Sequence, residues 1–223
     1  IAACASCARW QLAFSILLEM PQRRVQPGAA SFGPVISACE NQALWQHALV
    51  ALAAMRQGML EPDVIVCSAA ITACEKSARW KLASRLLSQM RQEQLEPNCI
   101  VYNAVISAFG RCAQWQKALS MLLEIRLQRL EADGISFSAA ISACEKGAQW
   151  QEGMRVLGDM YSLTLQPSGI TYNAAIISCG KGAQWRSAVE VLSEIRMRQT
   201  PSTAPYNAAI SACAAGAQWP VSL

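Results

Sequence analysis

The chain has 223 residues, of which 53% are hydrophobic and only 15% are charged, with a formal net charge of +4. An ordinary globular domain carries about 25% charged residues, and a disordered chain has the opposite bias. No uncharged apolar stretch reaches about 18 residues, so the sequence does not predict a membrane-spanning helix. The apolar residues are spread evenly, so some structure must bury them along the whole chain.

Tryptophan recurs in the sequence at a fixed interval. The seven tryptophans are 35 residues apart, or once 34, and stand at Trp10, Trp45, Trp80, Trp115, Trp150, Trp185 and Trp219. Six cysteines follow the same frame, at Cys4, Cys39, Cys74, Cys144, Cys179 and Cys213. Periods of about 20–50 residues are typical of repeat proteins. The chain is therefore predicted to be a stack of similar units without separate cores.

The units follow one another in chain order. Five are complete, the last of them one residue short: 29–63, 64–98, 99–133, 134–168 and 169–202. Residues 1–28 are predicted to end an earlier unit, and residues 203–223 to begin a later one. The sequence starts within a unit and without methionine. We therefore expect 1–223 to be a single array and a fragment of a longer protein.

Each unit is predicted to contain two helices. In the last complete unit, apolar residues at helical spacing predict helices at 171–181 and 184–197. Gly182 is expected to end the first helix, as glycine commonly does. Two short helices cannot bury their apolar faces alone, so the units must stack. The predicted fold is all-α, a right-handed α-solenoid of helix-turn-helix repeats.

The motifs of the units distinguish between the known helical repeats. Tryptophan opens the second helix, whereas tetratricopeptide repeats place it in the first. The first helix begins with VYNAVI at 101–106, TYNAAI at 171–176 and PYNAAI at 205–210, and units end in EPD at 61–63 or EPN at 96–98. Over its whole length the chain resembles the pentatricopeptide repeat family, of the plain 35-residue type.

One stripe of the first helix carries a recurring set of residues. In the unit 99–133 it consists of Ile100, Asn103, Ser107 and Arg111. Apolar residues recur at its first position, at Ile65, Ile100, Ile135 and Ile170, and cations at its last, at Lys76, Arg111, Lys146 and Lys181. A stacked base needs an apolar contact, its edge needs a hydrogen-bonding partner, and its phosphate needs a cation. The stripe therefore favours single-stranded RNA, read one base per repeat.

The resemblance implies which residues read the base. They are the residue after the aromatic in the first helix and the residue that closes the unit. The pairs are Gly33 with Asp63, Ser68 with Asn98, Asn103 with Asp133, Ser138 with Ser168, and Asn173 with Ser202, while Asn207 begins a sixth. The stripe itself predicts the isoleucines as base-sandwiching residues and the four cations as phosphate contacts. Its code implies roughly 5′-N-A-U-R-C-3′, with U read by Asn103 and Asp133.

The predicted function is sequence-specific binding of single-stranded RNA, and the resemblance implies RNA processing, stability, editing or translation in mitochondria or plastids. The partner is RNA, with protein partners also possible and no membrane or small-molecule substrate. The alternative is a scaffold that binds proteins on its concave face. No enzyme, cofactor or catalytic residue is expected. Cys4 and Cys7 lack a second pair at zinc spacing, and the single His47 excludes an H-E-x-x-H site.

Structural interpretations of the same residues stand beside the functional ones. The tryptophans and cysteines are expected to be packing residues, and the cysteines to be reduced. Asn and Ser in the first helix are also residue types that cap helices, and cations suit helix ends. Capping explains less well why the closing position is polar in phase with the opening one.

Overall fold

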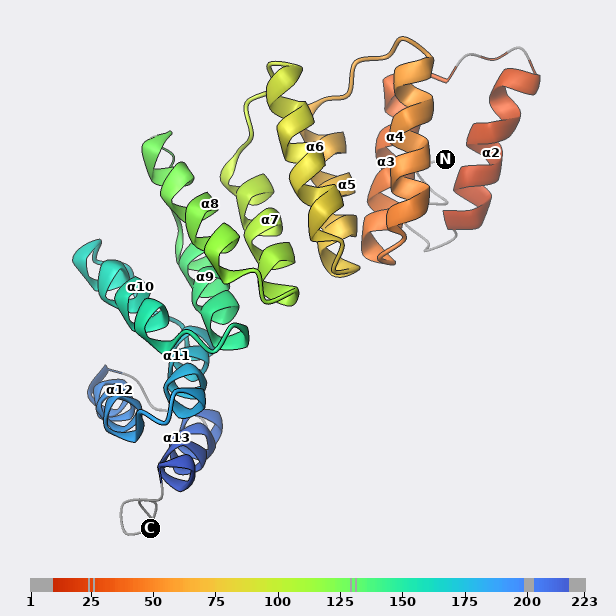
Figure 1. Ribbon diagram of the computed structural model, residues 1–223. Coiled ribbons are helices and arrows are strands. Elements are labelled where there is room, and N and C mark those ends of the chain that lie inside the picture. Colours follow the sequence, from red (N-terminus) through yellow and green to blue (C-terminus); the bar gives the residue numbers. More distant parts are fainter. Residues whose placement is uncertain are drawn as a thin grey trace. The chain divides into compact units, whose positions relative to one another are not determined.

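The structure, a computed structural model, describes residues 10–23, 25, 27–128, 130, 132–198 and 203–216. Within these residues the regular secondary structure is entirely helical (Figure 1). The helices are α2 (Trp10–Gln22), α3 (Ala29–Asn41), α4 (Trp45–Gln57), α5 (Val64–Lys76), α6 (Trp80–Gln92), α7 (Cys99–Arg111), α8 (Trp115–Leu127), α9 (Gly134–Lys146), α10 (Trp150–Ser162), α11 (Gly169–Lys181), α12 (Trp185–Arg198) and α13 (Thr203–Ala215). The fold is an all-α repeat solenoid, as the sequence predicts.

The helix bounds follow the repeat closely. The helices predicted at 171–181 and 184–197 are α11 and α12, which begin at Gly169 and Trp185. Each difference is one or two residues, which is the usual uncertainty of helix ends. Within the described residues, the second helix of each repeat begins at a tryptophan. The tryptophan interval of the sequence therefore gives the repeat length of the structure.

The chain forms two compact units, 1–108 and 109–223, whose border lies within α7. In the first unit α3 packs on α5, and α4 and α6 pack on these first helices. In the second unit α9 packs on α11 and α11 on α13 in the same way. A first helix therefore has neighbours on several sides, and large side chains such as Phe137 and Tyr172 are fully buried. This arrangement explains the high apolar content of the sequence.

Alanine, and not glycine, takes the left-handed conformation in the turns between paired helices. Ala183 has φ 54°, whereas Gly182 has φ −86°, which any residue adopts. Alanine has the same conformation at the equivalent turns, at Ala43, Ala78, Ala113 and Ala148. The helix α11 does end at Gly182, its C-cap, as predicted, but the left-handed conformation that usually favours glycine there belongs to Ala183.

Gly182 is required by packing. A Cβ atom on it would overlap the indole ring of Trp150 and lie 2.8 Å from Cγ. The same contact recurs in the second unit, where a Cβ on Gly147 would lie 2.5 Å from Cδ1 of Trp115. Each of these tryptophans thus packs its ring against the turn of the next repeat. This confirms a packing role for the ring.

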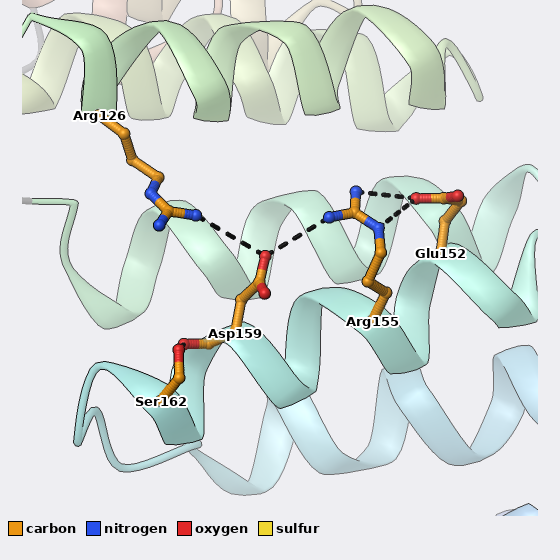
Figure 2. Close-up of polar contacts among 5 residues, drawn as sticks. All are labelled: Arg126, Glu152, Arg155, Asp159 and Ser162. Atoms are coloured by element: carbon orange, nitrogen blue, oxygen red, sulfur yellow. Dashed lines mark hydrogen bonds and ion pairs between the residues drawn. The ribbon is translucent and has the colours of Figure 1, made fainter.

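Charged side chains also connect the second helices of neighbouring repeats. Figure 2 shows Arg126 of α8 reaching Asp159 of α10, with an N–O distance of 3.8 Å, while Arg155 bridges Asp159 and Glu152. In the first unit Arg56 pairs with Glu93 at 2.9 Å. Partly exposed pairs of this kind contribute about 0–1 kcal/mol each to stability. The stacking of the repeats therefore depends only weakly on them.

The recurring cysteines within the described residues, Cys39, Cys74, Cys144, Cys179 and Cys213, are buried, as expected for packing residues. Burial raises the pKa of the Cys74 thiol to about 11 and that of Cys144 to about 12, so both stay protonated at neutral pH. Cys4 and Cys7 lie outside the described residues. No helix in the described part of the chain is long and apolar enough to cross a membrane.

Candidate nucleic-acid interface

The four predicted base-sandwiching residues are apolar and exposed. Ile65 and Ile170 are each 74% exposed, and Ile100 and Ile135 are each 64% exposed. Each is the second residue of a first helix, in α5, α7, α9 or α11. An exposed isoleucine is unremarkable by itself, but the same exposure at the same place in four repeats gives a regular set of apolar surfaces.

The predicted reading residues of the first helices lie one turn further along. Each is the fifth residue of its helix, at Gly33, Ser68, Asn103, Ser138, Asn173 and Asn207. The first five are half-buried and Asn207 is exposed. A cap precedes the first turn of a helix, so helix capping does not explain why these positions are polar.

Capping does explain the closing residues that the structure describes, each of which is the N-cap of the next first helix. Oδ1 of Asp63 accepts a hydrogen bond from the backbone N–H of Val66 at 2.7 Å, and Oδ1 of Asp133 accepts one from Ser136 at 2.8 Å. Asn98 and Ser168 accept the equivalent bonds. The polarity of the closing position therefore has a structural cause beside the reading role, and Ser202 lies outside the described residues.

One predicted reading pair is joined through a residue that sequence reasoning missed. Oγ of Ser138 lies 2.6 Å from Oγ1 of Thr171, which in turn lies 2.9 Å from Oγ of Ser168. Thr171 is fully buried. A serine or threonine two residues into the first helix is a weak sequence signal, because only the geometry shows what its hydroxyl contacts.

Consecutive first helices of the second unit enclose a hollow at the reading positions. This hollow, of about 560 Å³, lies between α11 and α13 and is lined by Asn173, Ile177 and Lys181 from α11 and by Asn207 and Ser211 from α13. Oδ1 of Asn173 is buried and has no hydrogen-bond partner among the described residues. Buried polar atoms are nearly always paired, so this oxygen marks a position where a ligand would supply a donor.

Two of the four predicted phosphate-contacting cations are held by the preceding repeat. Nζ of Lys181 lies 2.9 Å from the backbone oxygen and 3.0 Å from Oε1 of Glu145. Nζ of Lys76 lies 3.2 Å from the backbone oxygen and 3.6 Å from Oε1 of Glu40. The sequence contains a signal for these partners, because glutamate recurs at the position just before the cation. Only the structure shows that each glutamate contacts the cation of the following repeat.

The cation stripe is not uniform, because the repeat 99–133 has glycine in place of the glutamate. Gly110 stands where Glu40 and Glu145 stand in their repeats. Lys146, the cation of the following repeat, is exposed and has no hydrogen bond or ion pair within the described part of the chain. Arg111 is exposed at the same place in α7. Lys146 therefore has an ammonium group that is not already shared with a neighbouring carboxylate.

Groups of side chains suited to metal binding do not occur in the described residues. The single histidine, His47, lies among aromatic rings, with its centroid 4.7 Å from that of Trp10 and 5.4 Å from that of Phe14 in edge contacts. This environment agrees with a structural role for His47.

The chain is similar to known pentatricopeptide repeat proteins. The model of the pentatricopeptide repeat domain matches residues 51–111, and the PPR repeat model matches residues 100–130 and 170–199. No curated protein matches the sequence.

Solved structures match over nearly all of the chain. The pentatricopeptide repeat protein PPR10, solved in complex with an 18-nt psaJ RNA element, matches with a TM-score of 0.80 and 23% identity, over 99% of this chain and 32% of that one. PPR10 from maize matches with a TM-score of 0.73 and 21% identity, over 99% and 32%. The PPR domain of Arabidopsis thaliana protein-only RNase P 1, in complex with tRNA, matches with a TM-score of 0.58 and 12% identity, over 68% and 82%.

The chain thus spans about a third of the length of PPR10. Its repeat motifs, its stacked helix pairs and the matches of the family models agree with one another. The chain belongs to the pentatricopeptide repeat family.

Proposed function

We propose that this protein binds single-stranded RNA and reads one base per repeat along the stripe of its first helices. The observation that supports this most is the hollow between α11 and α13. Two asparagines in the repeat frame, Asn173 and Asn207, line it together, and a buried amide oxygen of Asn173 faces no partner. PPR10, which shares the fold, was solved in complex with RNA.

The chemistry of the stripe suits a nucleotide in each of its parts. The exposed isoleucine offers an apolar face for a base, the half-buried Asn or Ser offers donors and acceptors for its edge, and the cation offers a charge for the phosphate. A protein-binding scaffold needs the polar closing residue only as a helix cap, and it has no need for a polar opening residue in phase with it. Base-specific recognition of single strands does need both.

Selection of bound sequences from a random RNA pool, at stated salt, tests the proposed function. We expect enrichment of A-U followed one base later by C, in register with Ser68, Asn103 and Asn173. Asn103→Ala is expected to weaken binding to the selected RNA and to remove the preference for U at its own base. Equal binding of matched and scrambled RNA, with no loss in Asn103→Ala, would contradict RNA reading and favour the scaffold.

The uneven cation stripe gives a second expected result. Neutralising one phosphate contact on a single strand makes the salt slope of log K less negative by about 0.7. We expect the full 0.7 or so for Lys146→Met, and a smaller change for Lys181→Met, because Nζ of Lys181 is already bonded to Glu145. Binding of one RNA at four or more salt concentrations measures both slopes. Equal changes in the two variants would show that the Glu145 pair opens on binding.

The wider role is part of the proposal and rests on the family. We propose that binding protects or remodels an RNA segment in a mitochondrion or plastid, and that the repeats themselves do not catalyse a reaction. The fold also occurs in an enzyme, since the PPR domain of protein-only RNase P 1 has it. Incubating RNA with the purified chain and following its length on a gel tests the second point, and any cleavage product would contradict it.

A further inference from the structure

The hydroxyl of Thr171 contacts both members of one reading pair. Its Oγ1 lies 2.6 Å from Oγ of Ser138, in the first helix of the preceding repeat, and 2.9 Å from Oγ of Ser168, the N-cap of its own helix. It also accepts a hydrogen bond from the backbone N–H of Ser168 at 3.3 Å. In return the N–H of Thr171 donates to Oγ of Ser168 at 3.3 Å. Three polar partners therefore surround one buried oxygen.

The number of protons on these groups limits how they can bond. A hydroxyl has one proton to donate and two lone pairs to accept with. The backbone N–H of Ser168 occupies one lone pair of Thr171 Oγ1. One lone pair and one proton remain for the two serine hydroxyls. One serine must therefore donate to Thr171 while the other accepts from it.

We propose that Thr171 is a positioning residue of the reading site, which couples Ser138 and Ser168 so that they always offer a base one donor and one acceptor. The proposal rests on the proposed RNA-binding function. When Ser138 donates to Thr171, the proton of Ser168 is left for the base and Ser138 offers only lone pairs. When the three hydroxyls rotate, these roles are exchanged.

This coupling explains what the pair can recognise. Adenine presents an acceptor at N1 beside a donor at its amino group, and guanine presents a donor at N1 beside an acceptor at O6. Cytosine has the same pattern as adenine, at N3 and its amino group, and uracil has that of guanine, at N3–H and O4. A pair whose donor and acceptor exchange places by rotation of hydroxyl groups therefore matches all four edges. The repeat is expected to contact its base through one donor and one acceptor without distinguishing the four bases strongly.

Neighbouring repeats provide a natural comparison. Valine stands in place of Thr171 after two other reading pairs, at Val66 and Val101. The helix caps there are intact, since Asp63 accepts the N–H of Val66 at 2.7 Å and Asn98 that of Val101 at 3.1 Å. The hydroxyl at this position is therefore not needed for the bond of the closing residue to the helix, although in α11 it completes a capping box with Ser168.

The test is Thr171→Val in the full chain, compared with the wild type on four RNAs that differ only in the base facing Ser138. We expect the affinity for each of the four RNAs to fall about 3- to 10-fold, the effect of losing about one hydrogen bond that orients the reading hydroxyls. Thr171→Ser keeps the hydroxyl and is expected to restore these affinities. The midpoint of thermal unfolding is expected to change by only a few degrees.

A second set of RNAs, varied at the base facing Ser68, is the internal control. Valine, at Val101, already follows the pair of Ser68 and Asn98, so Thr171→Val should leave the ratios among these four affinities unchanged. If Thr171→Val changes the ratios among the RNAs varied at the base facing Ser68, or if Thr171→Ser fails to restore the affinity, Thr171 is only a packing residue and the proposal is wrong.

The remaining outcomes separate the coupling from the function it rests on. If the wild type discriminates at the base facing Asn103 but Thr171→Val binds all four RNAs as the wild type does, the coupling is overturned and RNA reading stands. If the wild type discriminates at no base, the proposed function is overturned, and the coupling with it.

Discussion

Replacing Asp133 with asparagine is expected to change the base preference of one repeat from U toward C without unfolding the protein. An ionised aspartate only accepts hydrogen bonds, which suits the N3–H donor of uracil. Asparagine has an amide N–H₂ group that donates, which suits the N3 acceptor of cytosine. We expect the ratio of affinities for the two RNAs to change by about 10- to 100-fold, because one hydrogen bond is gained and one is lost at the base edge.

The stability of the variant separates reading from capping. Asp133 caps α9, and asparagine caps helices about as well as aspartate. Asn98, which accepts the N–H of Val101 at 3.1 Å, performs this role in the same protein. The free energy of unfolding is therefore expected to change by less than about 1 kcal/mol, with the loss of charge at the helix start included.

Two comparisons complete the experiment. Asp133→Ala removes both the cap and the reading group, so it should lose about 1 kcal/mol of stability together with all preference at its base. Binding of the U and C RNAs by fluorescence anisotropy, and urea unfolding of each variant, give the two readouts. A preference for U that persists in Asp133→Asn would mean that this residue only caps the helix.

Gly182→Ala is expected to destabilise the protein, by about 2 kcal/mol. The Cβ atom would overlap the ring of Trp150, and overpacking of this kind costs about 1–3 kcal/mol. The backbone at Gly182 has φ −86° and ψ 6°, which alanine adopts freely. Without the ring, the substitution would stabilise the protein slightly by restricting the unfolded chain. The sign of the effect therefore depends on the tryptophan.

A double-mutant cycle with Trp150→Leu isolates this contact. In the Trp150→Leu background the effect of Gly182→Ala is expected to vanish or change sign. Gly158→Ala is the matched control, because nothing lies within 4 Å of a Cβ there and alanine favours a helix over glycine by about 1 kcal/mol. Urea unfolding of the four proteins and the control gives the values. No loss in Gly182→Ala would mean that the ring moves aside at little cost.

The N-terminal unit shows how a side chain is accommodated at this place. Ser77 occupies the position of Gly182, and its hydroxyl donates to the backbone oxygen of Ala43 at 2.7 Å. The guanidinium of Arg79 lies 4.9 Å from the ring centroid of Trp45. Glycine is therefore required at Gly147 and Gly182, where the tryptophan ring lies against the turn. Other repeats accommodate a side chain at the same position.

The helices and the frame of the site could be read from the sequence because they depend on periodicity. The tryptophan interval gives the start of each second helix, and helical spacing within the unit places Ile170, Asn173 and Lys181 on one face. The N-caps of the first helices could also be predicted, since Asp and Ser before a helix are ordinary N-cap residues. The observed N-caps at Asp133 and Ser168 show that this signal belongs to the closing residue and not to the opening one.

The remaining features depend on contacts between repeats, which a pattern along one chain does not contain. The sequence shows a glycine beside the later turns, as at Gly147 and Gly182, but not the ring that requires it, so Gly182 was assigned a backbone role that Ala183 performs. It shows a column of cations but not that Glu145 holds Lys181. The position of the Thr171 hydroxyl between two serines needs side-chain geometry in the same way.

The contact between a tryptophan ring and the next turn makes each repeat of the C-terminal unit compatible with a copy of itself. The block 134–168 receives the ring of Trp115 at Gly147 and presents Trp150 to Gly182. A second copy of this block, inserted after the first, would meet the same surfaces on both sides. The protein can therefore be lengthened by whole blocks without a new interface. Under the proposed function, the number of nucleotides that it covers would then increase with the number of blocks.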